Sequence, residues 1–178
     1  MVPEKMTIIK MHLKRIRTIA DYQFGRSAGA ALFPDDVEFQ LSTTGRVRQI
    51  LLDKMRIATI RAQDGMLTLG IMGARNLHGF ARFPGHRVVV NSEAVPFVAR
   101  GKNAFARHVL SVDPDIRDGQ EVLVVDENDK LLATGKAMLC SGEMLAFKKG
   151  MAVDVRSGME ADGRLDKEKN YLEGRQKA

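Results

Sequence analysis

The stretch from Arg87 to Arg156 alternates short strand-like segments with turns, and this order limits what the chain can fold into. It opens with the β-branched run 87–90, directly after the breakers Pro84 and Gly85. Further strand-like segments follow at 104–110, 121–126, 131–139 and 151–155. Turn residues separate them at 101–103, 118–119 and 127–130. Several short strands joined by turns predict a small, mostly antiparallel β-barrel.

Four groups of residues within this stretch follow one another at the spacing of a known family. They are 100–105, 118–125, 133–137, and 141–144 with 149–153. Their order resembles the PUA domain, the module named after pseudouridine synthases and archaeosine transglycosylases. The resemblance covers about 70 residues. It implies a barrel that binds RNA, with the glycine loop lying against the acceptor end of tRNA.

The first 85 residues have a different organisation, because a helical pattern precedes a series of strands. A helix is predicted over 15–33, and Pro34 ends it because proline cannot continue a helix. Strand-like segments then follow near 37–42, 46–53, 56–62 and 66–71, and the first and last of them alternate apolar with polar residues. A short helix at 73–77 follows. The leader, 1–14, is ambiguous, and a short strand at Met6–Ile9 is one interpretation.

These patterns predict an α+β protein in three parts. A small mixed α/β domain spans 1–85, the PUA-type barrel spans 86–156, and a flexible charged tail spans 157–178. In the tail, charges of both signs are mixed with glycines and few large apolar residues, a composition that buries too little surface to offset the entropy of ordering.

The first domain carries a resemblance of its own, in 16–25, 42–46, 64–69 and Gly73-Ala74. These residues are similar to the domain that precedes the PUA domain at the C-terminal end of archaeal tRNA-guanine transglycosylases. The two resemblances together cover about 140 residues. In that family the chemistry resides in a (β/α)₈ barrel, which needs about 250 residues. Its structural zinc site needs several cysteines, and this chain has one, Cys140.

Charge and composition narrow the class of protein further. The net charge is +6, and residues 1–86 hold 13 Lys and Arg against 7 Asp and Glu, so the whole surplus lies in the first domain. Such a surface attracts phosphate backbones. No apolar run approaches the roughly 18 residues of a membrane helix. A single cysteine suits a reducing compartment, and we expect a cytoplasmic protein without a membrane contact.

The candidate RNA-binding residues all lie in the barrel. They are Arg100, Gly101, Lys102, Asn103, Phe105, Arg107, Lys136, Lys148 and Lys149. In the 100–103 loop, glycine permits close approach of a backbone and the flanking cations suit phosphates; the alternative is a plain turn. Lys148 and Lys149 have a second interpretation as the basic end of a helix. Lys136 and Arg107 could equally occupy a solvated strand face.

Other motifs in the first domain point to structure as readily as to binding. Five arginines could line a basic strip or be dispersed over the surface: Arg46, Arg48, Arg56, Arg61 and Arg75. The segment 25–29 has two glycines without a following Gly-Lys-Ser/Thr, and it predicts close helix packing. The histidines lack metal-ligand spacing, so we expect neither a metal nor another cofactor.

Two functions remain open, and an enzyme in its own right is disfavoured by the residue inventory. The first is a non-catalytic RNA-binding protein that recognises tRNA as the accessory subunit of an archaeosine tRNA-guanine transglycosylase or a related modifying enzyme. The alternative is a stand-alone adaptor for ribosomal or other structured RNA. The oligomeric state is left open by the sequence.

Overall fold

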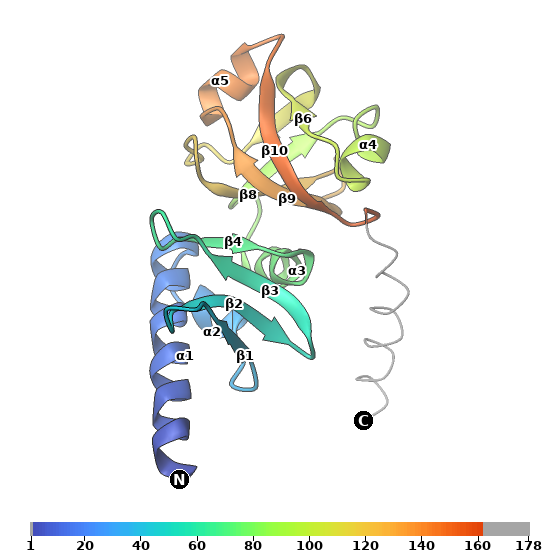
Figure 1. The fold of residues 1–178 in the computed structure, drawn as a ribbon. Helices are drawn as coiled ribbons and strands as arrows, with labels where there is room; N and C mark the ends of the chain where they lie inside the picture. Colours follow the sequence, from blue (N-terminus) through green and yellow to red (C-terminus); the bar gives the residue numbers. More distant parts are fainter. Residues whose placement is uncertain (1, 162–178) are drawn as a thin grey trace. The chain divides into compact units, whose positions relative to one another are not determined.

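The computed structural model describes residues 2–161, with side chains from residue 6 onward, and the chain divides into two compact units, Met1–His86 and Arg87–Ala178 (Figure 1). Each unit is built on its own β-sheet. The predicted tail, 157–178, lies outside the described residues from position 162 onward. The described part of it is ordered as the end of the last strand and a turn.

The first unit is an antiparallel four-stranded meander with helices packed on it. Its elements are α1 Val2–Phe24, α2 Ala28–Leu32, β1 Glu38–Leu41, β2 Val47–Leu52, β3 Met55–Ile60, β4 Leu67–Leu69 and α3 Ile71–Phe80. The strands pair in sequence order. All four strands predicted in this domain are confirmed.

The prediction for the N-terminal segment was wrong. The expected strand at Met6–Ile9 belongs to α1, and the helical segment expected over 15–33 consists of two helices separated by residues 25–27. Apolar residues recur every three or four positions from Met6 to Ala20, and this helical period outweighs the short apolar run at 8–9. Gly25 ends the helix at φ 101°, a conformation that favours glycine.

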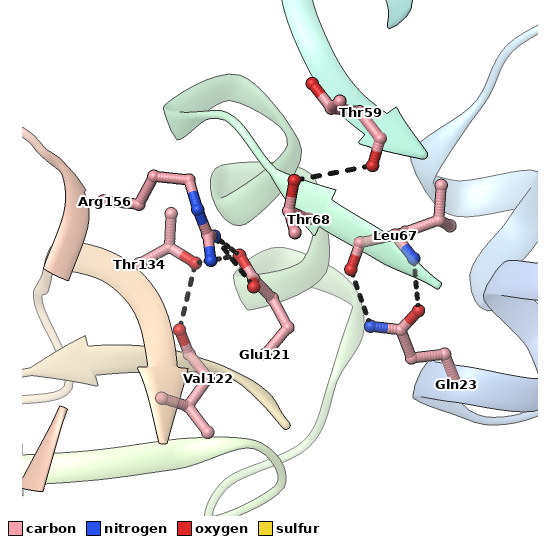
Figure 2. A network of polar contacts seen from close by, with 8 residues as sticks. All are labelled: Gln23, Thr59, Leu67, Thr68, Glu121, Val122, Thr134 and Arg156. Carbon is pink, nitrogen blue, oxygen red and sulfur yellow. Dashed lines mark hydrogen bonds and ion pairs between the residues drawn. The ribbon is translucent and has the colours of Figure 1, made fainter. Parts of the chain in front are cut away.

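The packing of α2 on α1 confirms the interpretation of the 25–29 segment. A Cβ atom at Gly29 would overlap the backbone carbonyl of Arg17. The Gly29 N–H also donates to the Asp21 carboxylate at 2.7 Å. Farther along α1, the Gln23 side-chain amide bonds both the N–H and the carbonyl of Leu67 at 2.8 Å, which ties the helix to the edge strand β4 (Figure 2).

The second unit is a six-stranded, nearly closed barrel. Its elements are β5 Arg87–Val90, α4 Val95–Ala99, β6 Ala104–Phe105, the 3₁₀ turn η1 Ala106–His108, β7 Val109–Val112, β8 Glu121–Val125, β9 Leu131–Ala137, α5 Ser141–Ala146 and β10 Met151–Gly158. The strand order is β6-β10-β9-β8-β5-β7. Every pair is antiparallel except β5 with β8, so the expected mostly antiparallel barrel is confirmed.

Two strand boundaries in the barrel differ from the prediction. The expected strand over 104–110 is broken by η1, because its first part pairs with β10 at one edge of the sheet and its last part pairs with β5 at the other. This turn carries the chain between the edges and nearly closes the barrel. The last strand continues to Gly158, where a Cβ atom would overlap the Ala99 carbonyl and approach the Gly101 nitrogen to 2.5 Å.

An ion pair between a buried carboxylate and a partly exposed arginine crosses three strands on the outer side of this barrel. Arg156 on β10 donates to both carboxylate oxygens of Glu121 on β8, at 2.6 and 2.8 Å (Figure 2). Thr134 on β9 lies between them and donates to Glu121 and to the Val122 carbonyl. The apolar interior is formed instead by inward residues such as Val122 and Val124. Period-two alternation thus separates the polar network from the core.

Candidate nucleic-acid interface

The loop that follows α4 has the geometry of a Schellman helix end. Gly101 has φ 86°, and its N–H donates to the Val98 carbonyl at 2.8 Å. The Lys102 N–H donates to the Phe97 carbonyl at 3.0 Å. These two bonds satisfy helix-end carbonyls and require a left-handed residue, which explains the glycine. The side chains of Arg100 and Lys102, on either side of Gly101, are exposed.

Asn103 is a structural member of the same loop. Its Oδ1 accepts the Val155 N–H at 2.9 Å, and its Nδ2 donates to the Met151 sulfur at 2.9 Å. Both contacts are to β10, about fifty residues away along the chain. The side chain therefore fixes the loop against the barrel. Of the four predicted loop residues, Arg100 and Lys102 are thus exposed, whereas Gly101 and Asn103 fix the conformation of the loop.

Strand pairing brings a second group of predicted residues to the β6 edge of the sheet. Phe105 lies opposite Met151 in the register, and the Ala106 N–H donates to the Gly150 carbonyl at 3.0 Å. Lys148 and Lys149 immediately precede Gly150 and are exposed. The aromatic ring of Phe105 is 45% exposed beside them along this edge. Segments more than forty residues apart thus form one surface, named here the β6 edge surface (Phe105, Arg107, Lys148 and Lys149).

Arg107 extends the β6 edge surface onto η1. Its side chain is exposed, and its Nε donates to His108 Nε2 at 3.0 Å. The His108 ring nitrogen accepts this bond in the tautomer that leaves it unprotonated. Because the bond uses only one of the guanidinium N–H groups, the others remain available to an acceptor.

Sequence reasoning missed two exposed aromatic rings that accompany these cations. Phe97 on α4 is 59% exposed, and Phe147, which follows α5, is 46% exposed. Phe147 immediately precedes Lys148 in the sequence. An exposed ring next to a lysine combines a stacking surface for a base with a phosphate contact. The signal in the sequence is the run Phe147-Lys148-Lys149, in which an aromatic residue precedes the two lysines.

Lys136 lies apart from the β6 edge surface. It occupies β9, with the whole of β10 between it and β6. Its Cα partners are Asp154 on β10 and Glu121 on β8, so carboxylates flank it across both ladders. Opposite charges at paired positions attract one another. Lys136 is half-buried in these surroundings, which suit a phosphate less well than those of Lys102.

Of the five arginines of the first unit that could line a basic strip, three are exposed. Arg61 pairs with Asp64 in the β3–β4 hairpin at 2.8 Å. Arg75 is half-buried on α3. The other three, Arg46, Arg48 and Arg56, are exposed on or beside β2 and β3. The surplus positive charge of this unit is therefore presented by separate arginines and by the lysines of α1.

Within residues 2–161 no group of three or more His, Cys, Asp or Glu side chains could hold a metal ion. In the same part of the chain, no helix is both long and apolar enough to cross a membrane.

Barrel topology, the glycine-ended α4 and the preceding meander define a class: a two-domain protein in which a PUA-type barrel follows an α+β domain in the sequence. Family models agree with this division. Residues 14–84 match the patch-forming domain C2 of tRNA-guanine transglycosylase, and residues 86–159 match the PUA domain. The chain thus carries a domain of the patch-forming C2 type followed by a PUA domain.

Curated proteins similar in sequence to this chain include several named tRNA-guanine(15) transglycosylase. The tRNA-guanine(15) transglycosylase of Pyrococcus furiosus is 51% identical over 145 residues, which are 82% of this chain and 24% of the relative. The enzyme of Methanothermobacter thermautotrophicus is 48% identical over 147 residues, 82% of this chain and 22% of the relative. The chain therefore spans about a quarter of the length of these relatives.

Solved structures support the fold of both units. A hypothetical protein of Pyrococcus horikoshii has a TM-score of 0.67 and 23% identity, with 88% of this chain and 95% of that chain covered. A conserved PUA domain protein from Thermoplasma acidophilum has a TM-score of 0.59 and 20% identity, with 89% and 95% covered. At these identities the likeness concerns the fold alone.

Proposed function

We propose that this protein binds tRNA without catalysing a reaction itself, and that it serves as the accessory subunit of an archaeosine tRNA-guanine transglycosylase or a related tRNA-modifying enzyme. The observation that carries the proposal is the identity of about half of all residues with named transglycosylases across both domains. The matched residues make up about a quarter of the length of these relatives. The catalytic residues would then be supplied by a partner polypeptide.

Two parts of the barrel would share the contact with RNA. Arg100 and Lys102 would bind phosphates from the end of α4, while Gly101 and Asn103 hold the loop in shape. Lys148, Lys149 and Arg107 would bind phosphates along the β6 edge surface, where Phe105 and Phe147 offer rings to unpaired bases. Cations and exposed rings together favour a helix end with unpaired nucleotides over an uninterrupted duplex.

RNA binding is tested by gel-shift titration of the full chain with a tRNA transcript at low salt. The control ligand is a DNA duplex of the same length, which has the phosphates but lacks the 2′-hydroxyls and the single-stranded end. We expect tighter binding to tRNA, with an affinity that falls as salt rises. Equal affinity for the two ligands would refute tRNA recognition.

The accessory role is tested separately by exchange of labelled guanine into tRNA. The assay compares the partner transglycosylase polypeptide alone with the same polypeptide plus this protein. A rate increase at limiting tRNA supports the role, since the added protein raises the local concentration of substrate. An unchanged rate, with tRNA binding intact, would overturn the accessory role and favour the stand-alone adaptor.

A further inference from the structure

The apolar face of α1 continues beyond the domain that it helps to build. Leu13, Ile16 and Ala20 lie on one side of the helix and are buried in the first unit. Met6 and Ile9 continue that side at the same spacing of three and four residues, yet they are 54% and 40% exposed. Figure 1 shows the N-terminal part of α1 extending past the sheet of its own unit. We call Met6 and Ile9 the exposed stripe.

The position of the last contact with the sheet shows where the domain stops covering the helix. The ring of His12 packs against Phe39 of β1, with ring centroids 5.6 Å apart. Toward the N-terminus from this point, residues 6–11 are all exposed. The family match begins at residue 14, so the exposed part of α1 precedes the matched domain. The first turns of α1 therefore contribute little to the core of this unit.

An exposed apolar stripe on a protruding helix suits a partner that covers it. Helices gain most of their stability from packing an apolar face against other groups. Contiguous exposed apolar surface marks interaction sites more often than chance placement does. An amphipathic helix that lies in a groove uses anchors spaced at three and four residues, as Met6 and Ile9 are.

The charges on α1 indicate which kind of partner could cover the exposed stripe. Lys10 and Lys14 follow the stripe on the same helix and are exposed, and no Asp or Glu occurs between residues 5 and 20. Two copies of this helix would bring like charges together along their contact. A groove with carboxylates along its rim would instead attract the lysines and accelerate association.

We propose that residues 6–11 of α1 dock into a partner protein that presents an apolar groove rimmed by Asp and Glu, which would also attract the exposed Lys14. We identify this partner with the catalytic subunit of the transglycosylase, and in that respect the inference rests on the proposed function. The docking helix would then link the two polypeptides, while the barrel at the other end of the chain sequence is left to bind tRNA.

Photo-crosslinking identifies the occupant. The full chain, with p-benzoylphenylalanine at position 9, is added to extract from cells that normally make it, and the product is sequenced by mass spectrometry. The control carries the same residue at position 11, where Met11 is exposed on the opposite side of the helix. We expect a product with another polypeptide from position 9 only, attached near a carboxylate-bordered apolar segment. A product with a second copy of this chain, or none, would overturn the proposal.

The affinity of the captured partner is then measured with purified proteins. Ile9→Glu is expected to weaken binding about tenfold or more, because it brings a carboxylate into an apolar groove with an acidic rim. Met11→Glu is expected to change it by less than about twofold. Equal effects of the two variants would contradict the assignment of the stripe. Melting temperature should be unchanged in both, since each residue is exposed and glutamate favours helix.

Gel shifts with tRNA separate this inference from the proposed function. Ile9→Glu should bind tRNA as the unchanged protein does, because its stripe is not among the RNA-binding residues. Docking that depends on Ile9 in a protein that does not bind tRNA would uphold the helix and reject the proposed function. A protein that binds tRNA but does not dock through Ile9 would uphold the proposed RNA binding and reject the docking helix.

Discussion

Replacing Asn103 with alanine tests whether this loop residue is structural. In the folded chain, Asn103 Oδ1 accepts the Val155 N–H at 2.9 Å, and the site is half-buried. The change removes this acceptor and the weaker bond from Nδ2 to the Met151 sulfur. The loop would then lose its polar attachment to β10, and the Val155 amide would lose its partner.

The expected loss in the free energy of unfolding follows from the burial of the Val155 amide. A buried donor left without a partner costs about 1–3 kcal/mol. Because the site is only half-buried and water reaches part of it, we expect the lower part of this range, about 1–2 kcal/mol. A loss of 1 kcal/mol lowers the melting temperature of a domain of this size by about 4–8 °C, so the barrel should melt about 4–16 °C earlier.

Differential scanning calorimetry of the full chain measures the effect on the barrel transition. Asn103→Asp is the matched control, since it keeps an oxygen for the Val155 N–H and loses only the donor to sulfur. We expect it to cost less than half as much as alanine. If Asn103→Ala melts within about 1 °C of the unchanged protein, or if both variants lose the same amount, the hydrogen bond to Val155 is not what holds the loop.

Three further changes separate binding from stability. Lys102→Ala should leave the melting temperature unchanged and reduce the salt slope of tRNA binding by about one unit, as measured by gel shifts at several salt concentrations; an unchanged slope would place the phosphate contact elsewhere. Lys148→Ala combined with Lys149→Ala should reduce that slope by about two units, whereas the helix-end interpretation predicts a loss of stability with binding intact. Gly29→Ala should destabilise the first unit by about 1–3 kcal/mol in thermal unfolding, because its Cβ overlaps the Arg17 carbonyl; a neutral result would show that α2 shifts without cost.

The strands of both sheets were predictable because their signals are local. Val37, Phe39 and Leu41 alternate with polar residues, and β1 covers most of that run. The run 122–125 is apolar and rich in the β-branched residue valine, and all of β8 is buried. Glycines at turns were equally informative, since a left-handed backbone favours one residue type, as at Gly101 and Gly119.

The candidate site was predictable in composition but not in the roles of its members. The order of motifs pointed to the loop 100–103 and to Lys148 and Lys149. That Asn103 is engaged by β10 depends on a pairing across about fifty residues, which no local pattern encodes. The exposed ring of Phe147 was missed for a related reason, since apolar residues are equally compatible with a core position until packing is known.

What the sequence determined by itself is the series of elements and the turns that punctuate them, because period, branching and glycine act over a few residues. Tertiary structure decided which of two compatible states each ambiguous segment adopts. It breaks the segment after Ala104 into β6, η1 and β7, because the ends pair with opposite edges of the barrel. It also leaves Met6 and Ile9 exposed while Leu13 and Ile16 on the same helix are buried. A sequence fixes which side of a helix is apolar, but only the surrounding fold determines how far along the helix that side is covered.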